Sequence, residues 1–162
     1  MMTTIAYRHM VNKTRPPVHW LRVWGLLVIL LFPTLGWADT PVHINVKTIL
    51  ASNDSNDFDP ALNSFTSSLR SIFRYSSYKL ISENSMTLQM NASGRIPLPG
   101  DRRMTIVAKG ISSGRATLQL EIYSKSNRRF QTVVRLLNRS SITVGGPKYK
   151  GGYLLFNIYS SF

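Results

Sequence analysis

The chain has 162 residues, 43% of them apolar, and its 20 Lys and Arg outnumber seven Asp and Glu, which gives a formal net charge of +13. It contains no cysteine, and this excludes disulfide bonds, a thiolate nucleophile and every cysteine-based metal site. A chain this basic is attracted to polyanions, so the composition favours anionic partners.

The first 38 residues have the three-part layout of a secretory signal peptide. Positions 1–22 are basic and hold no acid, Val23–Ala38 is apolar, and Gly36 and Ala38 stand at −3 and −1 of a cleavage point. We therefore predict cleavage after Ala38 and one exported domain, 39–162, that is periplasmic or secreted. An uncleaved membrane anchor is the alternative, although sixteen helical residues span roughly 24 Å, less than the ~30 Å hydrocarbon core. Met10 is an alternative start.

The exported part begins with a predicted strand, a loop and a helix. Residues 42–50 alternate apolar and polar side chains, as a half-buried β-strand does, and the polar stretch 51–59 indicates a loop. Asp59 and Pro60 are typical of a helix start, with Asp59 as N-cap and Pro60 at the first helical position. The helix is predicted to run to about Arg74. Its apolar stripe consists of Leu62, Phe65, Leu69, Ile72 and Phe73.

The remainder of the chain alternates between strand and turn signals. The predicted strands are 78–81, 86–90, 94–98, 104–108, 115–124, 130–137, 141–144 and 153–159. A turn is predicted at Glu83-Asn84, and Pro99-Gly100-Asp101 is predicted to close a hairpin over 95–108. The glycine-rich stretch 145–152 is expected to be a long flexible connection.

The order of these elements predicts an α+β fold with a strand, one amphipathic helix and then a meander of antiparallel strands. We expect the helix to pack on one face of an antiparallel β-sheet or of a small β-sandwich. No linker indicates a second domain in the exported part.

Positive charge is concentrated in the second part of the chain. Residues 39–59 have a net charge of −3, whereas residues 60–162 have a net charge of +12. Basic pairs fall at two predicted hairpin ends, and a third turn region interleaves lysines with a tyrosine, a combination that binds phosphates and stacks on bases. The alternative for this third region is a plain hairpin loop with its lysines outward and its tyrosine packed down. The candidate binding patch consists of Arg102, Arg103, Arg128, Arg129, Lys148, Tyr149 and Lys150.

The exported part has few of the side chains that catalysis or metal binding needs. His43 is its one histidine, so a His-based metal cluster or a Ser-His-Asp relay has too few members. The loop 53–59 offers oxygen ligands but lacks the central glycine and closing Glu of a calcium loop. We expect no cofactor, no metal and no catalytic residue. A small hydrolase with a carboxylate-based site stays an alternative, and its candidate residues are Glu83, Asp101 and Glu121.

These observations favour a non-enzymatic exported binding or scaffold module that interacts with another cell-envelope component. The expected partner is an envelope protein or an anionic envelope polymer, bound through the basic hairpin ends or a free sheet edge. The alternative is a polyanion binder for lipopolysaccharide, wall polymer or nucleic acid, of which nucleic acid is not favoured. Membrane contact is expected only through the N-terminal segment, if that segment is uncleaved.

Overall fold

The computed structural model describes residues 40–162, and the predicted signal segment 1–38, with its cleavage point after Ala38, lies outside them. Most of the described part is β-strand. The elements are β1 (Val42–Ser52), the 3₁₀ helix η1 (Pro60–Phe65), α2 (Thr66–Ile72), β2 (Ser77–Leu88), β3 (Ser93–Leu98), β4 (Arg102–Ser112), β5 (Arg115–Ser124), β6 (Asn127–Leu137), β7 (Ser140–Tyr149) and β8 (Gly152–Ser161).

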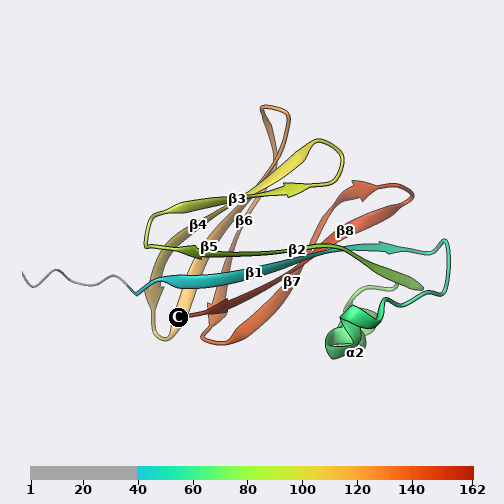
Figure 1. The fold of residues 1–162 in the computed structure, drawn as a ribbon, viewed down its shortest axis with the longest axis horizontal. Helices are drawn as coiled ribbons and strands as arrows, with labels where there is room; N and C mark the ends of the chain where they lie inside the picture. Colours follow the sequence, from blue (N-terminus) through green and yellow to red (C-terminus); the bar gives the residue numbers. More distant parts are fainter. Residues whose placement is uncertain (1–39) are drawn as a thin grey trace, which may run out of the picture. The chain divides into compact units, whose positions relative to one another are not determined.

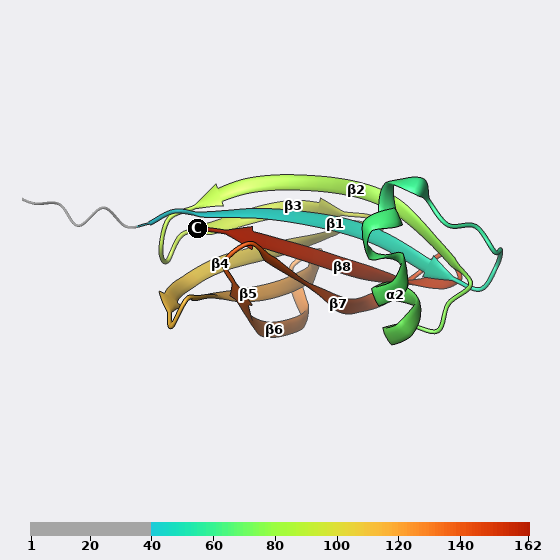
Figure 2. The same ribbon diagram turned by 90° about the horizontal axis from the view of Figure 1, so that it is seen from below.

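The strands form two antiparallel sheets of four strands each, which lie as two layers in Figures 1 and 2. Sheet A has the order β2-β1-β8-β7, and sheet B has the order β3-β4-β5-β6. Strand β8 returns to lie beside β1, so the two ends of the described chain meet in sheet A. The predicted antiparallel β-sheet is therefore confirmed.

The main core lies between the two sheets. It is built from the inward side chains of both layers, which alternate along each strand with outward ones. Its buried members are Val42, Ile44, Val46, Leu88, Ile96, Leu98, Met104, Ile106, Ala108, Ala116, Leu118, Leu120, Ile122, Val134, Leu136, Leu154, Phe156 and Ile158. The alternation predicted for 115–124 is confirmed, because Ala116, Leu118, Leu120 and Ile122 are all buried.

The predicted α+β fold class is wrong, because the protein is mostly β and no amphipathic helix forms a layer on a sheet. Residues 60–65 form a 3₁₀ helix and only Thr66–Ile72 are α-helical, so the predicted stripe is not continuous. Ile72 belongs to that stripe but is 66% exposed. The segment is rich in Ser, Thr and Asn, which favour caps and turns over helix interiors. No helix within 40–162 is long and apolar enough to cross a membrane.

The helical segment instead closes a small second cluster at one end of sheet A, seen at the end of β1 and β2 in Figure 2. Leu62 and Leu69 are buried there together with Tyr78 of β2. Asp59 caps the start of the helical segment and ties it to β2. Its carboxylate accepts hydrogen bonds from the backbone N–H groups of Ala61 (2.9 Å) and Leu80 (3.2 Å).

The predicted turn at Glu83-Asn84 is also wrong, because β2 runs through both residues. Glu83 lies opposite Lys47 of β1, and the Lys47 Nζ is 2.5 Å from its carboxylate. The Asn45 amide donates a second hydrogen bond of 2.8 Å to Glu83. Polar residues that favour a turn in isolation are therefore retained in the strand by cross-strand partners.

The expected flexible connection at 145–152 is a hairpin instead. Strand β7 continues to Tyr149 across a bulge between Gly145 and Lys148, and only Lys150 and Gly151 form the turn. Both turn residues have positive φ, 41° and 76°, as the favoured two-residue hairpin turn requires. Gly146 is needed because a Cβ there would lie 2.3 Å from the Phe156 ring.

Candidate anion-binding surface

Three hairpin turns lie at the same end of the two sheets, as Figure 1 shows for β3–β4, β5–β6 and β7–β8. The Lys125 N–H lies 3.4 Å from the Asp101 carbonyl, which joins the first two turns. The Arg102 guanidinium donates a 3.0 Å hydrogen bond to the Lys148 carbonyl, which joins the first and third. Basic residues from three turns are therefore brought together.

The seven predicted patch residues do not form one group. Arg102 and Arg103 are neighbours in β4, and neighbouring side chains in a strand point to opposite faces. The Arg102 side chain lies on the side of β4 that faces β7, whereas Arg103 points outward from sheet B and is exposed. The predicted patch is thereby split into a tip cluster and a part of the outer face of sheet B.

The tip cluster consists of Arg102, Lys148, Tyr149 and Lys150. The Tyr149 ring lies against the β3–β4 turn, where a Cβ on Gly100 would be 3.5 Å from it. Lys150 Nζ lies 5.5 Å from the centre of that ring, and Lys148 Nζ lies 5.6 Å from the Tyr153 ring. Cation–π contacts of this kind hold ammonium groups near the surface without neutralising them.

Arg103 and Arg128 flank Tyr123 on the outer face of sheet B. The Arg103 guanidinium lies 4.9 Å from the Tyr123 ring centre and donates a 2.8 Å hydrogen bond to the Lys125 carbonyl. Arg128 is opposite Tyr123 in the β5–β6 register, and its Nη1 is 3.4 Å from Glu121. Arg129 is the extra residue of the bulge beside this pair, and it is exposed.

Glu121 is the one acid on the outer face of sheet B within the described residues, and its neighbours stabilise its charge. The Tyr123 hydroxyl donates a 2.7 Å hydrogen bond to it, and the Gln119 amide donates one of 2.8 Å. These hydrogen bonds lower the pKa of the Glu121 carboxyl, with a smaller contribution from Arg128. The hydrogen bond between Tyr123 and Glu121 also raises the pKa of the Tyr123 hydroxyl. Glu121 therefore stays ionised and offsets only one positive charge.

Sequence reasoning missed three arginines on the same outer face. Arg95 of β3, Arg115 of β5 and Arg135 of β6 are exposed and alternate with buried neighbours. The alternation was readable in the sequence, but only the correct strand pairing places the residues on one face. We call five residues together the arginine face: Arg95, Arg103, Arg115, Arg128 and Arg135.

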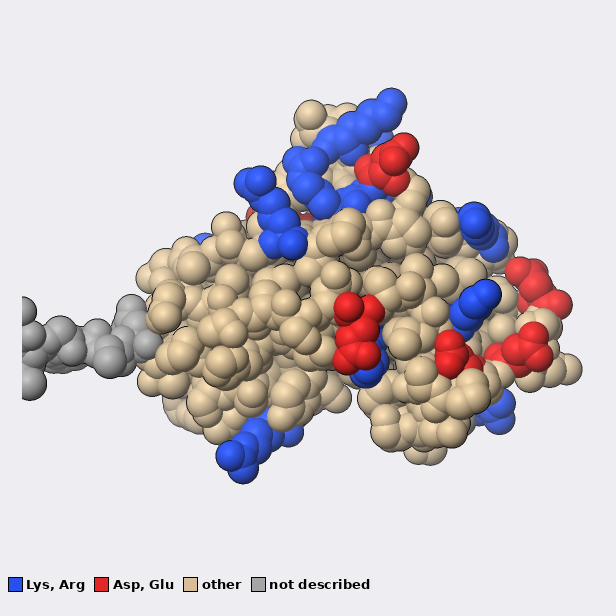
Figure 3. All heavy atoms as spheres, in the orientation of Figure 1, with Lys and Arg blue, Asp and Glu red and all other residues tan. Residues whose placement is uncertain are grey.

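The outer face of sheet A differs sharply in charge. Its strands present Asn45, Ser85, Asn157 and Tyr159 outward, and its ion pair Lys47–Glu83 is neutral overall. This side is turned to the viewer in Figure 3, where charged side chains are sparse over the middle and basic ones gather over the hairpin tips. The described part of the molecule is therefore strongly basic on one side.

The three carboxylates of the hydrolase alternative are not brought together. Glu83 is on the outer face of sheet A, Glu121 is on that of sheet B, and Asp101 is in the β3–β4 turn. The Lys47 ammonium, which hydrogen-bonds to Glu83, is the main cause that lowers the pKa of this carboxyl. Neither glutamate has the raised pKa that a general acid needs.

Metal ligands are also scattered in the structure. His43 lies on the outer side of β1, where its Nδ1 is 2.9 Å from the Thr87 hydroxyl. Within residues 40–162 no three His, Asp or Glu side chains are grouped so that they could hold a metal ion.

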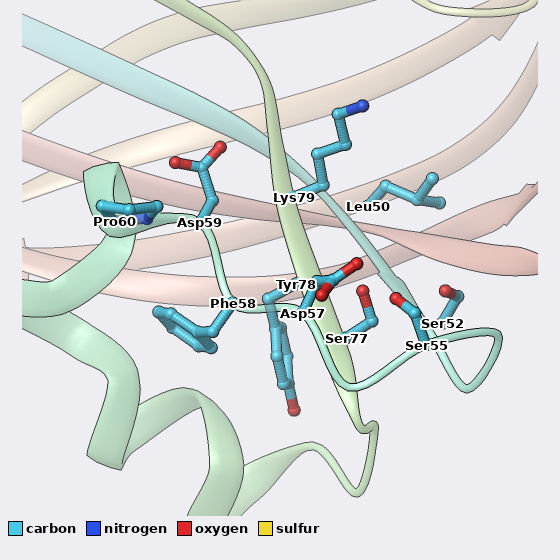
Figure 4. Close-up of a pocket in the computed structure, with 10 residues that line it drawn as sticks. All are labelled: Leu50, Ser52, Ser55, Asp57, Phe58, Asp59, Pro60, Ser77, Tyr78 and Lys79. Atoms are coloured by element: carbon cyan, nitrogen blue, oxygen red, sulfur yellow. The ribbon is translucent and has the colours of Figure 1, made fainter.

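A hollow of about 490 Å³ lies between the end of β1, the loop 53–59 and the start of β2 (Figure 4). Figure 4 shows oxygen atoms of Ser52, Ser55, Asp57 and Ser77 on one side of it, while Lys79 points away. Asp59 also lines the hollow, but its two oxygens are occupied by the backbone of Ala61 and Leu80. The hollow therefore has the groups to hold a small polar molecule, but no constellation for catalysis.

Comparison with known proteins adds no functional assignment. No protein-family model matches the chain, and the search of curated proteins found no match.

Proposed function

We propose that the chain is an exported, non-enzymatic binding module that recognises an anionic component of the cell envelope. Export is inferred from the signal-like residues 1–38, and anion binding from the basic side of residues 40–162. The proposal keeps the sequence-based hypothesis of an envelope partner and gives preference to an anionic one.

The observation that carries this proposal is the separation of charge between the two outer faces. Five arginines lie on the outer face of sheet B against one acid, whereas the charges at the centre of the other outer face cancel. The tip cluster continues this basic side at one end of the sheets. Clustered positive charge raises the local concentration of polyanions and releases their counterions on binding.

A salt series with a soluble polyanion tests the proposal. The exported form would be titrated with long-chain polyphosphate by fluorescence anisotropy between 50 and 200 mM salt, roughly the range over which such complexes weaken strongly. The logarithm of Kd should rise linearly with the logarithm of the salt concentration, which means that the affinity falls as salt is added. Replacing Lys148 and Lys150 by Gln should weaken binding and make the slope shallower.

The matched control is the double variant K47Q/R139Q, which removes the same charge from the middle of β1 and from the β6–β7 turn, at the end of β7 away from Lys148 and Lys150. It should retain most of the affinity, because its charges lie away from the tip cluster. Affinity that is independent of salt, or equal losses in both double variants, would show that the basic side is not the binding surface.

Pairing of a partner protein with a sheet edge is a second candidate. Of the four edge strands, β3 is short and holds Pro97, and β7 holds Pro147 beside its bulge. Strand β2 has 12 residues and no proline. Its outer side is bonded to the loop 57–59 at Tyr78 and Leu80, and no backbone partner is described for the rest of that side, which makes this part of β2 an edge suited to strand addition. Such a complex should survive a high-salt wash of a pull-down, whereas a polyanion complex should not.

A further inference from the structure

The arginine face exposes aliphatic side chains as well as charge. Val133 and Leu137 of β6 are 53% and 49% exposed, and Arg135 stands between them on the same side of the strand. Exposed aliphatic side chains at an edge strand gain nothing from contact with a hydrated polymer, but they are stabilised when they enter an apolar layer. The composition of this face is therefore that of a surface that meets both charge and hydrocarbon.

The charges on this face are spread in two dimensions. Arg95 is on β3, Arg103 on β4, Arg115 on β5, and Arg128 and Arg135 are on β6, so all four strands of sheet B contribute. With strands about 4.8 Å apart and about 3.3 Å per residue, the five groups cover roughly 15 by 26 Å. The hollow at the end of β1, described above, is lined by no residue of sheet B. A broad surface suits a planar partner better than a single extended chain.

Five of the cations on this face are arginines, and Lys109 is an exposed lysine at the β4 bulge. A guanidinium group donates two parallel N–H groups to a phosphate and is weakly hydrated, so it binds lipid headgroups more specifically than an ammonium group does. Arg103 is already held in place by Tyr123 and the Lys125 carbonyl, and Arg128 by Glu121. Arg95, Arg115 and Arg135 are exposed, so their guanidinium groups can reach an external phosphate.

We propose that the arginine face docks on an anionic lipid bilayer. This rests on the proposed function and names its partner: the guanidinium groups bind headgroup phosphates, while Val133 and Leu137 enter the headgroup region. Sheet A then faces away from the bilayer and keeps its neutral outer face in water. Membrane contact would thus come from the folded domain, in addition to any contact by the N-terminal segment.

Vesicle co-sedimentation tests this inference. The full chain is expressed, its exported form is purified, and every variant is compared in that same form. The vesicles are neutral phosphatidylcholine alone, or the same lipid with phosphatidylglycerol. The wild-type protein should bind the anionic vesicles and not the neutral ones. The triple variant R95Q/R115Q/R135Q should bind the anionic vesicles roughly 100-fold more weakly, because each charge near such a surface is worth about fivefold.

The matched control removes three charges elsewhere. R70Q/R74Q/K79Q changes the net charge equally, but these residues lie on the helical segment, after it and at the start of β2. It should lose no more than a few-fold in affinity. A second pair of variants separates charge from the other features of the face. R95K/R115K/R135K keeps the charge but loses the paired N–H donors, so it should weaken binding, although less than the Gln triple variant does. V133T/L137T should weaken binding to anionic vesicles while leaving polyphosphate binding unchanged. Circular dichroism of each variant shows that it is folded.

The outcomes separate this inference from the proposed function. Binding to polyphosphate without binding to anionic vesicles would overturn the bilayer proposal and leave the anion-binding module standing. Absence of binding to both would overturn the two together. Equal losses in the triple variant and its charge-matched control would show that net charge alone attracts the protein, and that the arginine face has no part in docking.

Discussion

At the residue scale, Gly152 marks a close approach between β8 and β1. A Cβ on Gly152 would lie 2.3 Å from the Ala51 carbonyl oxygen and 3.0 Å from the Ser52 Cβ. Backbone atoms cannot move aside as the end of a flexible side chain can, so the strand pair has to separate locally. The absence of a side chain at this position is thus part of what holds sheet A together.

We expect Gly152→Ala to lower the free energy of unfolding by about 1–3 kcal/mol, the usual range for overpacking. Gly110→Ala is the matched control, because nothing lies within 4 Å of the Cβ that it adds. The control should change stability by less than about 1 kcal/mol. Urea unfolding of both variants measures the difference, and equal stabilities would contradict the close approach of the two strands.

Glu121 gives a residue-scale prediction about pH. Its folded pKa is lowered, so its contribution to stability is present above the unfolded pKa of about 4.3 and is lost as the pH falls through the folded value. Tyr123→Phe removes the hydrogen bond that lowers this pKa most, so the Glu121 carboxyl should then titrate at higher pH. Carbon NMR of the carboxyl signals measures the midpoint. The Glu83 midpoint should not change, and an unmoved Glu121 midpoint would contradict the role of Tyr123.

At the scale of elements, the helical segment 60–72 covers the small second hydrophobic cluster at one end of sheet A. Leu62 and Leu69 are its buried members, at 0% and 1% exposure, whereas Ile72 is largely in water. Leu62→Ala and Leu69→Ala should each cost about 2–5 kcal/mol of stability, as other buried leucines do. Ile72→Ala should cost less than about 0.5 kcal/mol. Chemical unfolding of the three variants tests this, and similar losses in all three would restore the continuous stripe predicted from the sequence.

Strands were predictable where one face is buried and the pattern alternates. The predicted strand 115–124 has the bounds of β5, and the hairpin around Pro99-Gly100-Asp101 was also predicted correctly. The errors fell where local preference and tertiary contacts disagree. Glu83 favours a turn in isolation but is paired with Lys47, and the glycines of 145–152 indicate flexibility but permit close packing of β7 on β8.

The helix was overpredicted for a related reason. Hydrophobic spacing alone pointed to one helix over 60–74, but it did not account for the low helix propensity of the serines between the apolar residues. The capping residue Asp59 was identified correctly, and its second contact, with Leu80 of β2, could only be found in the folded structure.

At the scale of the whole molecule, net charge was visible in the sequence but its placement was not. Arg102 and Arg103 look like one basic pair in the chain, yet the alternation of β4 sends them to different surfaces. Arg95, Arg115 and Arg135 are far apart in sequence and share a face only because β3, β4, β5 and β6 are adjacent. Pairing of strands cannot be derived from local pattern, so the arginine face was missed.

The central claim is that the basic side of the sheets, and not the molecule as a whole, contacts an anionic partner. Amide chemical-shift mapping of the isotope-labelled protein during titration with polyphosphate measures this most directly. The largest shifts should fall on β3, β4, β5, β6 and the three hairpin tips, and the signals of Asn45, Ser85 and Asn157 should stay unchanged. Shifts centred on the outer face of sheet A or on the helical segment 60–72 would contradict the account.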